Sequence, residues 1–208
     1  MEPRQVRSAA DARAIVDERG VNHVKVGAFD IDGIMRGKYI SRDKFLSSLD
    51  GGFGFCDVVL GWDCQDQLYD NVQYTGWHTG YPDAPVRLLP DTCRTLPFEE
   101  NGLFFLGEFS PPGEAVCSRG LLRRVLERAR AMGFEAYVGF EYEFFVFKET
   151  PESVREKDYR GLTPMAPGWF GYSVIRNSTG NAFYRQLLDH CRDMDMAIEG
   201  LHEETGPG

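Results

Sequence analysis

The chain has 208 residues, with 23 Lys plus Arg against 32 Asp plus Glu, so its formal net charge is −9. This acidic balance leaves no basic excess to displace counterions from phosphates, which argues against nonspecific DNA or RNA binding. Hydrophobic residues make up 42% and charged residues 26%, a globular composition that excludes disorder. No stretch approaches the length of uncharged apolar sequence that a membrane span needs, so we expect none.

The N-terminus and the cysteines indicate the cellular compartment in which we expect the protein. The first residues lack the apolar core of a secretory signal peptide. Cysteine occurs five times, which is an odd number, and no C-x-x-C motif is present. We therefore expect free thiols in a reducing compartment, the cytoplasm.

The first elements along the chain predict a small α+β domain. Residues 8–20 fit a short helix that begins with a capping box, Ser8 and Asp11, and ends at a glycine. Residues 24–28 and 34–40 then flank a tight Asp-Gly turn, which predicts a β-hairpin. A strand, a turn, a strand and a helix in this order are typical of such a sheet domain.

More elements follow the hairpin. Ser41 can cap a helix that carries Phe45, and residues 86–89 and 103–109 are the clearest further strand candidates. Pro111-Pro112-Gly113 breaks the chain. We therefore expect one domain over 1–112 and a second over 113–208.

The second half predicts an α/β layer. The expected elements are a helix over 118–132 capped by Ser118, a strand over 134–148, a long loop over 150–179, a helix around 183–191 and a strand over 197–201. Helix, strand, helix and strand in this order indicate helices on one face of a sheet.

Two carboxylates lie on the first of these expected strands. Glu141 and Glu143 are two residues apart, so in a strand both point to one face. Two like charges on an aromatic-rich strand are costly unless a cation lies between them. Hard carboxylate oxygens suit Mg²⁺ or Mn²⁺. The alternative is the solvated face of an edge strand.

A second acidic cluster lies near residue 208. Three acids and a histidine fall within residues 199–204, inside a segment that begins as an apolar strand. The segment is not an H-E-x-x-H zinc helix, because Gly206 stands where the second histidine is needed. A strand end with polar caps is the alternative interpretation.

Taken together, three segments resemble the glutamine synthetase superfamily of ATP-dependent carboxylate–amine ligases. Gly139 to Phe147 reads GFEYEFFVF and is similar to that family's G-x-E-x-E-F-F-x-F strand. Glu199 to Gly208 is similar to its E-x-x-H-x-E-x-x-P-G segment, and Val24 to Tyr39 resembles its opening hairpin. The order and separation of the three segments agree with the family.

The resemblance implies an N-terminal β-grasp domain followed by the first part of a catalytic α/β domain. It also implies Mg²⁺ or Mn²⁺, ATP as co-substrate, glutamate, ammonia or a small amine, and a homo-oligomeric ring with shared active sites. The implied site residues are Glu141, Glu143 and Glu204 as metal ligands, Glu203 as the alternative to Glu204, Glu199 at ATP, and His202 beside glutamate and the transferred phosphoryl group.

One loop departs from the family pattern. Glutamine synthetases proper usually carry F-D-G-S-S, whose Asp helps deprotonate ammonium in the neighbouring subunit's site. The comparable stretch here reads FCDVVLGW, which makes Asp57 the catalytic candidate and leaves Asp63 and Asp66 as alternatives. The departure leaves the acceptor open between ammonia, a polyamine and another amine.

The family's catalytic domain continues well beyond the residues matched here, with further ligands for metal, ATP and glutamate. We therefore expect this chain to be an N-terminal fragment of a ligase. The alternative is a non-catalytic glutamine synthetase-like structural or binding protein, which the retained acidic cluster disfavours.

The fragment interpretation makes a prediction about the purified chain of 208 residues. Without the remaining ligands and neighbouring strands, the chain alone should be poorly stable and should not hydrolyse ATP. Phosphate release in the presence of glutamate, Mg²⁺ and an amine measures this. Turnover by the purified chain would overturn the interpretation.

Overall fold

The computed structural model describes residues 1–166 and 168–206, and its contacts divide the chain into two compact units, Met1–Ala136 and Tyr137–Gly208. The division that the sequence predicts between residues 112 and 113 stays a prediction. Each unit is described by itself below. No helix among the described residues is long and apolar enough to cross a membrane.

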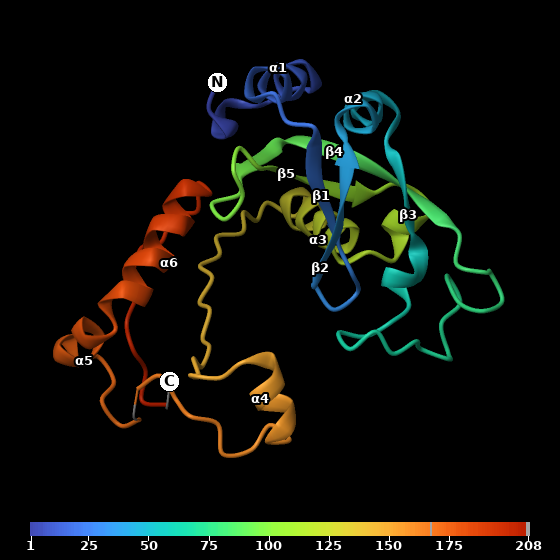
Figure 1. Ribbon diagram of the computed structural model, residues 1–208. Helices are drawn as coiled ribbons and strands as arrows, with labels where there is room; N and C mark the ends of the chain where they lie inside the picture. Colours follow the sequence, from blue (N-terminus) through green and yellow to red (C-terminus); the bar gives the residue numbers. More distant parts are fainter. Residues whose placement is uncertain (167, 207–208) are drawn as a thin grey trace. The chain divides into compact units, whose positions relative to one another are not determined.

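The N-terminal unit is a mixed α+β structure around one five-stranded sheet (Figure 1). The sheet order is β2-β1-β5-β4-β3, with β1 (His23–Phe29), β2 (Met35–Ser41), β3 (Phe53–Cys56), β4 (Asp83–Thr95) and β5 (Leu103–Phe109). Neighbouring strands are antiparallel except for the parallel pair β1 and β5. The predicted hairpin and the two later strands are therefore confirmed, and β4 extends well beyond residues 86–89.

Helices lie on both sides of this sheet. Figure 1 shows α1 (Ala9–Arg19) and α2 (Arg42–Gly51) over one face and α3 (Ser118–Ala131) on the other side. Three short 3₁₀ turns complete the unit: η1 (Pro3–Gln5), η2 (Asp57–Leu60) and η3 (Gly113–Ala115).

Local sequence determines where α1 and α2 begin and end. The Ser8 side chain accepts from the Asp11 amide while Asp11 bonds back to the amide of Ser8, which is a capping box. Gly20 ends α1 at φ 62°, a left-handed conformation that favours glycine. Ser41 caps α2 as expected, accepting from the amide of Lys44. The predicted caps of these two helices are confirmed.

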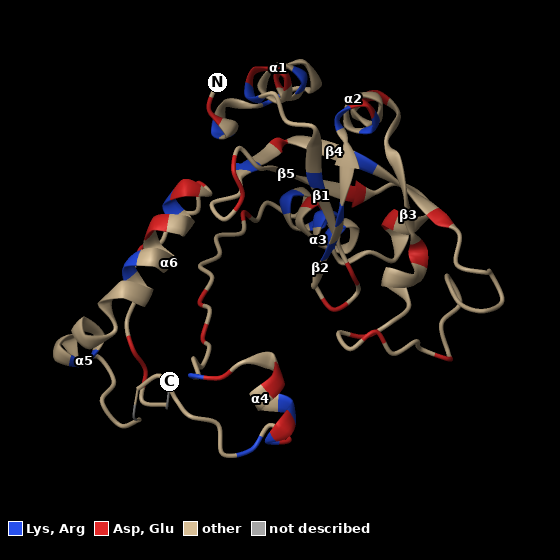
Figure 2. Cartoon of the chain, viewed as in Figure 1, with Lys and Arg blue, Asp and Glu red and all other residues tan. Residues whose placement is uncertain are grey.

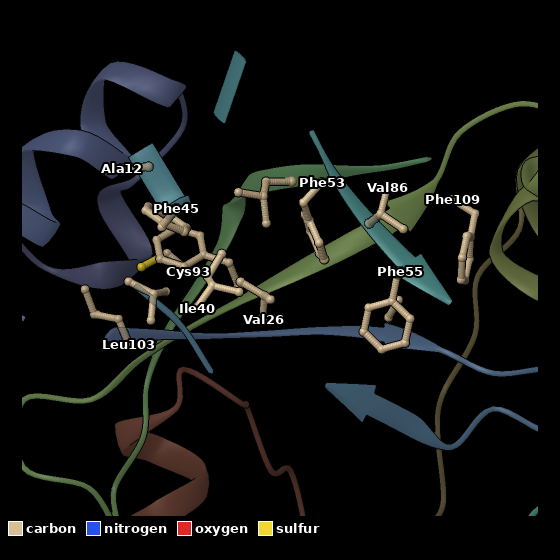
Figure 3. Close-up of a cluster of buried hydrophobic side chains, with 14 of the residues drawn as sticks. Ala12, Val26, Ile40, Phe45, Phe53, Phe55, Val86, Cys93, Leu103 and Phe109 are labelled. Atoms are coloured by element: carbon tan, nitrogen blue, oxygen red, sulfur yellow. The ribbon is translucent and has the colours of Figure 1, made fainter. Parts of the chain in front are cut away.

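The core lies between the sheet and the pair α1 and α2 (Figure 3). Alternate residues of β1, among them Val24 and Val26, are fully buried, as the period of a half-buried strand requires. The Phe45 ring of α2 lies on the Phe105 ring of β5, with centroids 4.7 Å apart. Burial of each such side chain contributes about 1.5–3 kcal/mol.

Asp30 organises the turn of the hairpin although its side chain is fully buried. One carboxylate oxygen accepts from the amides of Asp32 and Ile34, at 3.0 and 2.8 Å. The other oxygen accepts from Arg36 Nε at 2.8 Å. These three donors offset the loss of hydration of the carboxylate and connect the turn to β2.

A second buried carboxylate, Glu108 on β5, connects the sheet to α3. Arg87, Arg119 and Arg123 all form ion pairs with it, the Arg123 contact measuring 2.9 Å. Burial alone would raise the pKa of Glu108, but the Arg123 hydrogen bond and the three positive charges outweigh it and lower that pKa.

Two expectations about α3 need correction. Its N-cap is Cys117 and not Ser118, because Cys117 Sγ accepts from the Gly120 amide at 3.2 Å. The helical period also predicts an apolar face that includes Leu122 and Val125, but these side chains are 58% and 54% exposed.

Among its described residues, the C-terminal unit holds three helices joined by extended and turn segments (Figure 1). They are α4 (Pro151–Glu156), α5 (Val174–Thr179) and α6 (Asn181–Asp193). The predicted final helix is confirmed as α6. The segment 150–179, expected to be a long loop, contains α4 and α5. Thr150 and Ser173 are their N-caps, and these short helices lack the apolar periodicity by which a helix is predicted from sequence.

The two strands expected in this half are wrong for the described chain. Residues 134–148 and 197–201 contain no assigned strand, and the one paired position is an isolated bridge from Phe147 to Pro164. A strand is stabilised by backbone hydrogen bonds to a neighbouring strand. Within the described residues such bonds are confined here to the bridge, where the amide of Lys148 donates to the carbonyl of Thr163 and that of Met165 to the carbonyl of Val146, each at 2.8 Å.

The Asp30 network predicts the effect of removing its carboxylate. Asp30→Ala leaves the half-buried Arg36 and two amides without their acceptor, so the free energy of unfolding should fall by about 2–4 kcal/mol. Urea denaturation of the chain measures this, with Asp43→Ala at a 94% exposed side chain as control. Equal loss in both variants would contradict the role of Asp30.

The lowered pKa of Glu108 predicts acid sensitivity. Since the folded pKa of Glu108 lies below its ordinary value of 4.5, its stabilising contribution is present above that pH and is lost as pH falls through the folded pKa. The midpoint of urea denaturation should therefore fall on acidification. Glu108→Gln should lower the midpoint at neutral pH and flatten its pH dependence, and an unchanged pH dependence would contradict this account.

Candidate metal site

Glu141, His202 and Glu204 come together in the C-terminal unit. One ligand atom from each lies within 4.8 Å of the others, and all three side chains are exposed. His202 Nε2 is 2.7 Å from Glu204 Oε1. Figure 2 shows acidic residues on both extended segments of this unit.

Contacts between neighbouring segments position His202 and Glu204. The amide of Tyr172 donates to the carbonyl of Glu203 and the amide of Trp169 donates to that of Thr205, each at 2.8 Å. The Tyr172 ring stacks on the His202 imidazole, with centroids 4.4 Å apart and an interplanar angle of 11°. The backbone around His202 is therefore held along residues 169–172.

The segment that carries Glu141 lies against the segment that carries His202 and Glu204. A Cβ placed on Gly206 would lie 2.4 Å from a ring atom of Phe145, so any larger residue would require that ring to move. Gly206 follows Glu204 by two residues and Phe145 follows Glu141 by four. This contact lets the carboxylate of Glu141 reach the other two side chains.

The donor set fits a divalent metal ion. Two carboxylates supply the hard oxygens that Mg²⁺ and Mn²⁺ prefer, and the imidazole is a ligand that Mn²⁺ accepts more readily than Mg²⁺. A cation would also offset the repulsion between the two carboxylates.

Two other predicted residues lie outside this group. Glu143 and Glu199 are both exposed, and neither belongs to the set whose ligand atoms converge. Glu143 would share a face with Glu141 only in a strand, where side chains alternate. Residues 134–145 form no strand in the described chain. The roles of Glu143 at metal and Glu199 at ATP stay predictions.

Glu203, the alternative ligand, has a different environment. It is only 7% exposed, and Arg176 Nε lies 2.9 Å from its Oε2. The hydroxyl of Tyr184 donates to Oε1. Burial and this carboxylate raise the pKa of Tyr184 to about 12. Neither Arg176 nor Tyr184 belongs to a sequence motif, so neither could be singled out before the structure.

The catalytic candidate Asp57 is in the N-terminal unit. Its side chain is buried and accepts from Thr75 Oγ1 at 2.5 Å. Of its alternatives, Asp63 accepts from the amides of Gln65 and Gln67 in a local turn, and Asp66 pairs with Arg36 at 2.7 Å. All three therefore have structural partners, and the catalytic role of Asp57 stays a prediction.

Comparisons with known proteins agree with the motifs. Residues 115–208 match the family described as glutamine synthetase, catalytic domain. The chain is 42% identical over 188 residues to type-1 glutamine synthetase 2 of Dictyostelium discoideum, covering 89% of this chain and 36% of that protein. It is 30% identical to a glutamate–isopropylamine ligase of Pseudomonas, covering 94% of this chain and 44% of the relative.

A solved structure shows the same fold. The GmaS/ADP complex superposes with a TM-score of 0.65 at 14% identity, covering 95% of this chain and 42% of that one. The sequence matches are therefore to ligases of the glutamine synthetase type, with residues 115–208 similar to their catalytic domain. The chain spans less than half the length of these relatives.

Proposed function

We propose that these residues are part of an ATP-dependent ligase that joins ammonia or a small amine to the γ-carboxylate of glutamate through a γ-glutamyl phosphate. The observation that carries this proposal is the convergence of Glu141, His202 and Glu204 inside the segment that matches the catalytic domain. The activity belongs to a longer protein that contains these residues.

The chemistry explains why acids would be concentrated here. Bound Mg²⁺ or Mn²⁺ would neutralise phosphate charge during phosphoryl transfer from ATP to glutamate. Glu141, His202 and Glu204 would hold the cation, with Glu143 as a further predicted ligand. His202 would also lie beside glutamate and the transferred phosphoryl group, and Glu199 would lie at the nucleotide. The amine then displaces phosphate from the acyl phosphate.

The acceptor is ammonia or a small amine. One relative is named a glutamine synthetase and another a glutamate–isopropylamine ligase, which supports ammonia and small amines as the two classes of acceptor. The Asp57 carboxylate is buried and accepts from the Thr75 hydroxyl, so it is not exposed to meet ammonium, which favours an amine other than ammonia.

The proposal includes the organisation of the longer protein. Residues 1–112 would form a β-grasp domain and residues 113–208 the start of the catalytic domain. The longer protein would assemble as a homo-oligomeric ring with shared sites. Five free cysteines favour a reducing compartment, the cytoplasm.

The departure at Asp57 favours one second candidate, a non-catalytic relative that binds ATP and metal without turnover. The two differ in one observable: only a ligase releases phosphate when glutamate and an amine are both present.

The test uses the longer protein with ATP, glutamate, Mn²⁺ and a panel of ammonia, ethylamine and isopropylamine. Glu141→Gln and Glu204→Gln should each lower kcat/KM by roughly 100-fold or more, because each removes a charged metal ligand. Glu135→Gln, an exposed acid earlier on the same segment, is the matched control and should retain activity.

Phosphate release with one of these amines, lost in both site variants, supports the ligase. Metal-dependent ATP binding without phosphate release for any amine would favour the non-catalytic candidate. Full activity of both variants would contradict the assigned site.

A further inference from the structure

Glu203 has a buried carboxylate between two exposed site residues. Its exposure is 7%, whereas its sequence neighbours His202 and Glu204 are exposed and converge with Glu141. In an extended backbone successive side chains point to opposite sides, which explains this division. Glu203 therefore points into the C-terminal unit where its neighbours point out of it.

Both oxygens of Glu203 are engaged. Oε2 forms the ion pair with Arg176 of α5, and Oε1 accepts from the Tyr184 hydroxyl of α6. Arg176 is itself only 8% exposed, and neither its three guanidinium nitrogens nor Glu203 Oε2 forms a hydrogen bond among the described residues, so the pair is held by charge attraction. Since each charge is buried, loss of either leaves the other without compensation.

The backbone connects this buried pair to the exposed site. Residues 169–172 lead into the N-cap of α5 at Ser173, whose side chain accepts from the amide of Arg176. The same residues bond to the carbonyls of Glu203 and Thr205. The position of α5 is therefore coupled to the segment that carries the site.

We infer that Arg176 and Tyr184 are positioning residues that hold the carboxylate of Glu203 as an anchor, so that His202 and Glu204 are presented together. Glu203 is then a structural anchor and not a metal ligand. The inference rests on the proposed metal role of the site.

Two readouts test it in the chain at low temperature. The first is Mn²⁺ affinity, from the electron paramagnetic resonance signal of free Mn²⁺. The second needs no metal: the Tyr172 ring should shift the His202 ring protons upfield in NMR. The chain has four histidines, so comparison with His202→Gln assigns the signal.

Arg176→Gln should weaken Mn²⁺ binding 10–100-fold, the usual cost of losing a residue that orients a ligand, and should reduce the upfield shift of His202. Tyr184→Phe, which removes one hydroxyl without changing the ring, should give a smaller effect of the same kind. The double variant Arg176→Gln/Glu203→Gln should recover part of the upfield shift, because no buried charge remains.

Two control variants distinguish a structural anchor at Glu203 from a metal ligand at Glu203. Glu204→Gln should lose Mn²⁺ affinity but keep the His202 shift, and Arg185→Gln at an exposed position of α6 should change neither. An unchanged shift and affinity in Arg176→Gln would overturn the inference. So would loss of Mn²⁺ binding in Glu203→Gln while Arg176→Gln binds normally, since Glu203 would then be a ligand.

A different outcome would contradict the proposed metal role of the site without contradicting the anchor. If the unmodified chain binds no Mn²⁺ but its His202 shift responds to Arg176→Gln, the anchor is upheld and the metal site is wrong.

Discussion

A carboxylate can be buried only where donors replace its water, and this constraint determines much of the structure. Removal of a carboxylate from water costs several kcal/mol, so each buried acid requires charged or hydrogen-bonding partners. Asp30 fixes the hairpin turn, and Glu108 connects β5 to α3. Glu203 holds the segment that carries His202 and Glu204. The exposed acids are thereby distinguished from the buried ones as the groups free to bind a cation.

Much of the N-terminal unit could be predicted from sequence because its signals are local. Ser8 and Ser41 cap helices through amides three residues away, and the Asp-Gly turn fixes the hairpin register. The expected strands over 134–148 and 197–201 depend on distant neighbours for their hydrogen bonds, and sequence alternation carries no information on whether those neighbours are present.

The site was predictable to the extent that it rests on short motifs. Glu141 and Glu204, two of the acids that the motifs name as ligands, lie together with His202, whereas Glu143 is outside this group and the regular strand assumed beneath Glu141 is absent from the described chain. Arg176 and Tyr184 could not be anticipated. Their importance arises from burial against Glu203, and burial of a charged pair becomes visible only once the chain is folded.

The central claim is that Glu141, His202 and Glu204 form a divalent metal site. The most direct measurement is an anomalous difference map at the manganese absorption edge, from crystals grown with Mn²⁺. The account predicts a peak within coordination distance of these three side chains, with Glu203 still paired to Arg176. A peak ligated by Glu203, or no peak at this group of residues, would contradict it.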